Sequence, residues 1–140
     1  MTLYCVDSGV WIGAFNPKDA HHERAKPIIK AVTDGEPGGI IITDHIFGEV
    51  ATYTRRKIGI EKSVKAARAM LDTDHVEIIV INDDLFSASY HIFERYPQLS
   101  FADAASIVVM RNQDVTEIFS FDSGFDGVRE VNRLNALPKP

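Results

Sequence analysis

Cysteine is almost absent from this 140-residue sequence, and the single Cys5 excludes an internal disulfide. Because Cys5 lies in the apolar run of residues 3–6, we expect it to be a small buried core residue. No stretch approaches the uninterrupted apolar length that a membrane-spanning helix needs. The first residues contain neither a basic leader nor a long apolar segment, so no signal peptide is expected. These absences predict a cytoplasmic protein that does not associate with membranes.

Positive charge is also scarce, because 15 Lys and Arg residues face 20 Asp and Glu residues and leave a net charge of -5. A non-specific binder of polyanions is expected to be basic, so avid and unselective nucleic-acid binding is disfavoured. The exception is the segment 55–68, which holds six basic residues against the single acid Glu61. The six are Arg55, Arg56, Lys57, Lys62, Lys65 and Arg68. They form either a solvated face or a set of phosphate contacts that would position RNA without reading its sequence.

No repeat, low-complexity segment or long linker divides the chain, so we expect one domain over residues 1–140. Apolar runs predict strands at 3–6, 40–43, 76–81 and 115–121, with a short fifth strand at 130–134. Helical patterns predict helices at 10–15, 20–34, 45–57, 61–71, 84–96 and 100–111. Strands that alternate with helices and lack strict polar alternation indicate an α/β fold, with helices on both faces of a parallel sheet.

Acidic residues stand at several of the expected helix starts. We predict that Asp19, Asp44 and either Asp83 or Asp84 cap the helices that follow them. Ser100 also starts a helix, and an acid three residues later completes a plausible capping box.

Aromatic and histidine residues give weaker signals. Tyr4 and Tyr53 are predicted to lie in the core, and Trp11 either in the core or at a dimer contact. The adjacent His21 and His22 point in different directions on a helix and cannot easily face one metal ion. They are interpreted as polar residues at a helix start.

Four carboxylates lie close to apolar runs: Asp7, Glu49, Asp103 and Asp122. Each has an ordinary explanation, because Asp7 and Asp103 suit helix caps and Asp122 suits a turn. Glu49 is harder to explain, since its neighbours are apolar and a buried acid should be paired, protonated or bound to a cation. In parallel α/β folds, ligands bind beyond the carboxyl ends of strands where the strand order reverses. If strands 3–6 and 115–121 are neighbours, Asp7 and Asp122 meet there.

Clustered carboxylates without a positive partner repel one another, and their pKa values rise. A divalent cation relieves this repulsion, and a set of oxygen ligands suits Mg²⁺ or Mn²⁺. Such a site can activate and orient a water molecule for attack on a phosphodiester. A metal-dependent phosphodiesterase is therefore the leading hypothesis.

Four segments together resemble the PIN-domain nucleases, and specifically the VapC-like toxins. The segments are residues 6–12, Glu49 after the second strand, residues 99–104 before a late helix, and residues 120–126 after the fourth strand. The resemblance covers essentially the whole chain and rests on the order and spacing of the motifs, since none is specific alone.

This resemblance implies a three-layer α/β/α fold with a five-stranded parallel sheet and an acidic pocket that binds Mg²⁺ or Mn²⁺. It also implies hydrolysis of single-stranded or structured RNA that leaves a 5′-phosphate. The four carboxylates match the four family acids. Gly124 stands where the family often has a further acid. Asp126 either replaces that acid through a water molecule or lies on the surface, which we favour. Ser8 matches a family hydroxyl that orients Asp7 or a water, although helix capping would explain it equally well.

The resemblance further implies a homodimer and a small antitoxin protein that binds a groove formed by the helices carrying the basic segment. A PIN-fold RNA-processing nuclease that is not a toxin stays open, as does a non-catalytic binding module. A receiver-like signalling domain is disfavoured because Asp7 has no acidic neighbour and no lysine matching that family's lysine follows the last strand. A haloacid-dehalogenase-like phosphatase is disfavoured because Gly9 replaces its second aspartate.

Overall fold

A five-stranded parallel sheet with the order β3-β2-β1-β4-β5 forms the centre of the computed structural model, which describes residues 2–139. All four pairings between neighbouring strands are parallel. The strands are β1 (Leu3–Val6), β2 (Gly39–Thr43), β3 (Val76–Ile79), β4 (Glu117–Phe119) and β5 (Asn132–Leu134). The predicted fold class, including the short fifth strand, is confirmed.

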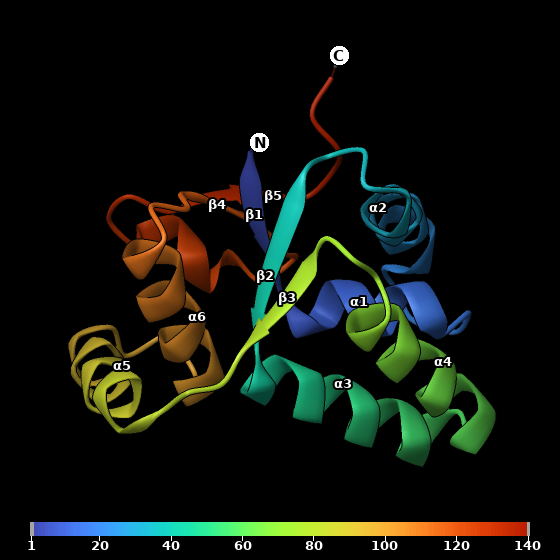
Figure 1. Ribbon diagram of the computed structural model, residues 1–140, viewed down its shortest axis with the longest axis horizontal. Coiled ribbons are helices and arrows are strands. Elements are labelled where there is room, and N and C mark those ends of the chain that lie inside the picture. The colour runs from blue at the N-terminus through green and yellow to red at the C-terminus, as the bar shows by residue number, and fades with distance from the viewer. Residues whose placement is uncertain (1, 140) are drawn as a thin grey trace.

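Helices cover both faces of this sheet, as Figure 1 shows, with α5 and α6 on one side and α1, α2 and α4 on the other. The α-helices are α1 (Ser8–Phe15), α2 (His22–Asp34), α3 (Asp44–Lys57), α4 (Ile60–Leu71), α5 (Asp83–Arg95) and α6 (Phe101–Asn112). A short 3₁₀ helix, η1 (Ser123–Gly127), follows β4. The three-layer arrangement is therefore α/β/α, as the sequence pattern indicated. Within residues 2–139, no helix is both long and apolar enough to cross a membrane.

The strand order reverses between β1 and β4, which pair directly through Cys5 and Ile118. The pairing continues one residue beyond β1, where the Asp7 N–H donates to the carbonyl of Phe119 at 2.9 Å. Both strands are almost completely buried, as is β2 on the other side of β1. The residues that directly follow β1 and β4 therefore meet at one crevice, as expected for Asp7 and Asp122.

Three predicted helix caps are wrong, because a neighbouring residue is the N-cap in each case. Asp19 does not cap α2, which begins at His22 with His21 as its N-cap. Thr43 caps α3 by accepting the N–H of Ile46. Asp44 is already helical, and its carboxylate instead accepts the N–H of Ile81 at 3.0 Å.

The start of α5 shows the same kind of error. Asn82 adopts the extended backbone of a cap, and its side chain accepts the N–H of Leu85 at 3.0 Å. Asp83 and Asp84 consequently occupy the first turn of the helix, where negative charge is also favourable. Acidic residues at a helix start thus identified the helices but not their first residues.

Most of the predicted core residues are buried. Cys5, Trp11 and Tyr4 lie in the main hydrophobic cluster, and the Trp11 indole donates to the carbonyl of Val6 at 3.3 Å. Tyr53 was predicted in the core but is 40% exposed. The buried face of α3 runs at four-residue intervals from Ile46, and Tyr53 lies one position off that face.

Candidate active site

An open pocket of about 390 Å³ lies at the carboxyl end of the sheet, where the strand order reverses. Its lining comes from the segments after β1 and β4, from the residues before α2, from α3 and from the start of α6. The lining residues are Asp7, Ser8, Gly9, Asp19, His21, Glu49, Ser100, Asp103, Phe121 and Asp122. All four predicted acids and Ser8 therefore line a single pocket.

Asp7 is the most buried of the four acids, with 8% of its surface exposed. It is the N-cap of α1, and its Oδ1 accepts the N–H of Ser8 at 2.9 Å. Its Oδ2 accepts a hydrogen bond from the hydroxyl of Ser120 at 2.8 Å. Both carboxylate oxygens are thus held in place. Ser8 begins α1 and holds Asp7 through its backbone.

The environment of Asp7 opposes its ionisation. Burial raises its pKa to about 7, and the charges of Asp103 and Glu49 act in the same direction. The hydrogen bonds from Ser120 and the Ser8 N–H partly offset these effects by stabilising the charged form. The structure thus places a carboxylate with a strongly raised pKa at the bottom of an acidic pocket.

Asp103 caps its own helix and also lines the pocket. Ser100 and Asp103 form the predicted capping box, since the Asp103 N–H donates to the Ser100 hydroxyl and Asp103 Oδ2 accepts the Ser100 N–H, both at 3.1 Å. Burial raises the pKa of Asp103, the bonds from Ser100 lower it, and the nearby Asp122 raises it. The two interpretations of Asp103 are therefore compatible.

Glu49 lines the pocket from α3, but the residue is exposed rather than enclosed by its apolar sequence neighbours. The buried face of α3 carries Ile46, Val50 and Thr54, and Glu49 lies beside this face rather than on it. The inference that its apolar neighbours bury it is wrong. Protein atoms around the pocket nevertheless raise its pKa, as does the charge of Asp103, while His45 and the Ser8 hydroxyl lower it.

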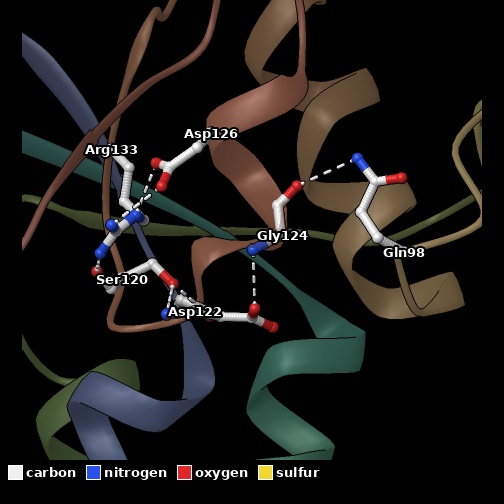
Figure 2. A network of polar contacts seen from close by, with 7 residues as sticks. Gln98, Ser120, Asp122, Gly124, Asp126 and Arg133 are labelled. Carbon is white, nitrogen blue, oxygen red and sulfur yellow. Dashed lines mark hydrogen bonds and ion pairs between the residues drawn. The ribbon is translucent and has the colours of Figure 1, made fainter.

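Asp122 is the N-cap of η1 and is exposed to solvent at the pocket rim. Its Oδ1 accepts the N–H of Gly124 at 2.8 Å, which Figure 2 shows. The Asp122 N–H donates to the same Ser120 hydroxyl oxygen that binds Asp7, at 3.0 Å. Ser120 therefore connects the two acids that follow neighbouring strands.

Asp126, which was considered as a substitute for an acid at Gly124, lies close to this turn in the sequence. Asp126 is exposed and does not line the pocket. Figure 2 shows Arg133 bound to both of its oxygens, at 2.8 and 3.0 Å, while the guanidinium also donates to the Ser120 carbonyl. These hydrogen bonds hold the pKa of Asp126 below its usual range. The favoured surface position of Asp126 agrees with this geometry.

The donor set of the pocket suits a hard divalent cation. Its lining has five carboxylates but no Lys or Arg to neutralise them, and three of the carboxylates have raised pKa values. Between residues 2 and 139, however, no three His, Cys, Asp or Glu side chains lie close enough to share one ion. The four acids share a pocket without forming a closed coordination shell, as expected of carboxylates that repel one another.

Three residues in or next to the pocket have roles that no sequence pattern indicated. Ser120 bonds to Asp7, and only its position directly after an apolar strand could have pointed to it. Asp19 was interpreted as a helix cap, yet it lines the pocket and accepts the N–H of His21 at 2.8 Å. His21 lines the pocket as well, and its ring stacks on Phe121 with centroids 4.5 Å apart. No local spacing signals either contact.

The six basic residues lie on α3 and α4, away from the acidic pocket, and none lines it. Arg55, Arg56 and Arg68 instead line a cavity of about 650 Å³ between these two helices. The apolar side chains of Val64 and Leu71 share that cavity. The structure therefore separates the basic segment from the candidate catalytic acids.

Comparisons with known proteins agree with this geometry. The model of the family described as PIN domain matches residues 4–131. The chain is 30% identical over 122 residues to the 23S rRNA-specific endonuclease VapC20 of Mycobacterium tuberculosis, covering 86% of this chain and 89% of that protein. The crystal structure of VapC20, described as a Sarcin-Ricin loop cleaving toxin, superposes with a TM-score of 0.76 at 28% identity and covers 91% and 98% of the two chains. VapBC2 from Rickettsia felis, bound to promoter DNA, shares the fold at a TM-score of 0.67 and 9% identity over 95% and 98%.

Proposed function

Because the chain belongs to the PIN-domain family, and within it to the VapC ribonucleases, we propose that it is a Mg²⁺- or Mn²⁺-dependent endoribonuclease. In this proposal residues 1–140 form one domain, and Asp7, Glu49, Asp103 and Asp122 hold the metal. Asp126 does not bind the metal in this proposal, because it forms an ion pair with Arg133. One observation carries the proposal: the pocket raises the pKa of the buried Asp7 to about 7 and lacks a lysine or arginine to balance its charge.

The divalent ion would supply the electrostatic stabilisation and the activated water that phosphodiester hydrolysis needs. The chain's own residues prepare the site for it. Ser120 and the Ser8 N–H fix both oxygens of Asp7, and the capping box fixes Asp103. Glu49 is exposed on α3 at the pocket, where it is suited to accept a proton.

The test is cleavage of a labelled RNA by protein that has been stripped of metal with a chelator. We expect no cleavage until Mg²⁺ or Mn²⁺ is added, and we expect products with a 5′-phosphate, detected by a 5′-phosphate-dependent exonuclease. Cleavage that persists in excess chelator, or products with a 2′,3′-cyclic phosphate, would refute the metal-dependent mechanism.

The first substrate to test is a structured ribosomal RNA loop, because the names of the relative VapC20 describe it as a 23S rRNA-specific, Sarcin-Ricin loop cleaving endonuclease. A hairpin of this kind should be compared with a single-stranded RNA of the same composition. Faster cleavage of the hairpin would support a toxin of the translation machinery. Equal cleavage would favour a general RNA-processing nuclease, the second candidate function.

A small antitoxin is the proposed protein partner, and the cavity between α3 and α4 is the proposed binding site. Its apolar lining by Val64 and Leu71, with three arginines around it, suits an acidic amphipathic segment. Leu71→Asp should abolish co-purification with a small protein encoded directly upstream, whereas Phe93→Asp on α5 should not. Loss of binding in both variants, or in neither, would place the partner elsewhere. The homodimer is a separate proposal, tested by sedimentation.

A further inference from the structure

Histidine 21 lies on the wall of the acidic pocket, although it is not one of the four proposed metal-binding residues. We propose that His21 binds the RNA, donating a hydrogen bond from its imidazole N–H to a phosphodiester oxygen at the cleavage site. This inference rests on the proposed ribonuclease function and assigns a substrate-binding residue to the same pocket.

Two contacts hold His21 in position. Its backbone N–H donates to Oδ1 of Asp19 at 2.8 Å, and the residue is the N-cap of α2. Its ring stacks on Phe121 with an interplanar angle of 19° and centroids 4.5 Å apart. Phe121 directly precedes Asp122, so the ring is anchored to the segment that carries a proposed metal-binding acid. A side chain fixed in this way loses little conformational entropy when it binds a ligand.

The ring nitrogens of His21 are free to bind a ligand. In the described part of the chain they make no hydrogen bond, and the residue is exposed. The neighbouring His22 differs, because its Nδ1 lies 2.8 Å from the carbonyl of Gly13 and serves the fold. Of these two adjacent histidines, His22 serves the fold, and His21 lines the pocket with ring nitrogens that make no hydrogen bond within residues 2–139.

The chemistry of the pocket explains why such a donor is needed. RNA is anionic, and five carboxylates line the pocket, so the protein surface repels the substrate except where cations intervene. No lysine or arginine contributes to the lining. Among the lining residues that the structure describes, His21 provides the only side-chain donor besides the hydroxyls of Ser8 and Ser100. An imidazole carries at least one N–H in either protonation state, so the contact does not depend on ionisation.

The rival role for His21 is a flat surface on which a base stacks, and two substitutions separate the roles. Phe at position 21 keeps a flat ring on Phe121 but removes the N–H donor. Gln removes the ring and keeps an N–H donor. A phosphate contact is lost in His21→Phe and partly retained in His21→Gln, whereas a stacking contact gives the opposite order.

The experiment measures binding of a fluorescently labelled RNA hairpin by anisotropy in Ca²⁺, and single-turnover cleavage in Mn²⁺. Because a hydrogen bond to a charged group contributes more than a neutral one, His21→Phe should bind about 10- to 100-fold more weakly than wild type. His21→Gln should fall between the two. His91→Phe, an exposed histidine on α5 outside the pocket, is the matched control and should bind normally. Thermal melting confirms that each variant is folded.

Wild-type affinity in His21→Phe, or a loss in His21→Gln as large as that in His21→Phe or larger, overturns the proposal. Failure of the ribonuclease function looks different: wild type and Asp103→Asn would then both leave the RNA intact, while the ranking of RNA affinities among the His21 variants would still report on the contact.

Discussion

Ser120 donates a hydrogen bond to Oδ2 of Asp7 at 2.8 Å, which joins two residues 113 positions apart in the chain. Both residues directly follow a strand, and β1 and β4 are neighbours in the sheet. The same hydroxyl oxygen accepts the N–H of Asp122 at 3.0 Å. One completely buried serine therefore orients the most buried acid of the pocket and the backbone of a second acid.

Ser120→Ala should impair catalysis without unfolding the protein. Removing a residue that hydrogen-bonds to a metal-binding carboxylate typically reduces metal affinity or activity by about 10- to 100-fold. The Ser120 hydrogen bond also lowers the pKa of Asp7, so its loss should raise that pKa further and move the acidic limb of the pH–activity profile to higher pH. The measurement is kcat/KM for RNA as a function of pH.

Ser89→Ala provides the control, because Ser89 is also buried and donates to a backbone carbonyl within α5, away from the pocket. It should cost about 1 kcal/mol of stability, like a typical hydrogen bond, and leave the pH profile unchanged. An unchanged profile in Ser120→Ala would contradict the role assigned to this contact.

The metal-free protein should become less stable as the pH rises from about 4 to about 7. The folded-state pKa of Asp7 is raised to about 7 from an ordinary value of 3.8, so in this range the native state binds more protons than the unfolded state. Stability is therefore greatest below the unfolded pKa and is lost as Asp7 ionises. The shift corresponds to on the order of 4 kcal/mol. Glu49 and Asp103 act in the same direction.

Urea unfolding at pH 5 and pH 8 with a chelator present measures this loss. Asp7→Asn should remove much of the pH dependence of the unfolding free energy. The other titrating groups remain in both proteins, so the difference between the two pH dependences gives the contribution of Asp7. Adding Mn²⁺ should restore stability at pH 8, because an ion that binds only the native state stabilises it. A metal-free wild type whose stability rises steadily from pH 5 to pH 8 would contradict the raised pKa.

Gly124→Asp should strengthen Mn²⁺ binding by roughly tenfold, about 1.4 kcal/mol, by supplying a further carboxylate next to Asp122. The backbone of Gly124 has no positive φ, so a side chain is tolerated. A Cβ would lie 3.2 Å from Oδ1 of Asp122, which requires a small side-chain adjustment. Gly124→Asn introduces the same crowding without the charge and is the control. Equal Mn²⁺ affinities of the two variants by calorimetry would refute the charge effect.

Asp126→Asn should leave Mn²⁺ affinity unchanged, because Arg133 binds both oxygens of Asp126 on the protein surface. Exposed ion pairs contribute little, so the stability should change only slightly. Calorimetric titration with Mn²⁺ checks the first expectation and thermal melting the second. A clear loss of Mn²⁺ affinity would instead support the water-mediated role that the sequence left open.

The sequence predicted the parts of this site that depend on local patterns and strand order. Asp7 and Asp122 directly follow apolar runs, and a parallel α/β fold brings such positions together. Asp103 was recognised through its capping box. Glu49 was placed correctly in the pocket for a wrong reason, since its apolar neighbours do not bury it. The helical period of α3 places Glu49 beside the buried face, where its side chain stays exposed.

The remaining parts depend on contacts that no local pattern encodes. Ser120 and His21 reach the site through packing between β1, β4 and the start of α2, at sequence separations that a single chain does not reveal. The predicted caps of α3 and α5 lie one or two residues too late, because Thr and Asn compete with Asp for this role. The predicted cap of α2 lies two residues too early. The last motif also has Gly124 in place of an acid, and only the structure shows that Arg133 binds the nearby Asp126.

The measurement that tests the central claim most directly is RNA cleavage in Mn²⁺ by wild type, Asp7→Asn and Asp103→Asn, with Asp74→Asn as an exposed control outside the pocket. Loss of a metal-binding carboxylate should reduce the cleavage rate more than loss of a residue that hydrogen-bonds to it. Both pocket variants should therefore cleave at least about 100-fold more slowly than wild type. Asp74→Asn should cleave like wild type. Equal cleavage by all four proteins would contradict the metal-dependent ribonuclease.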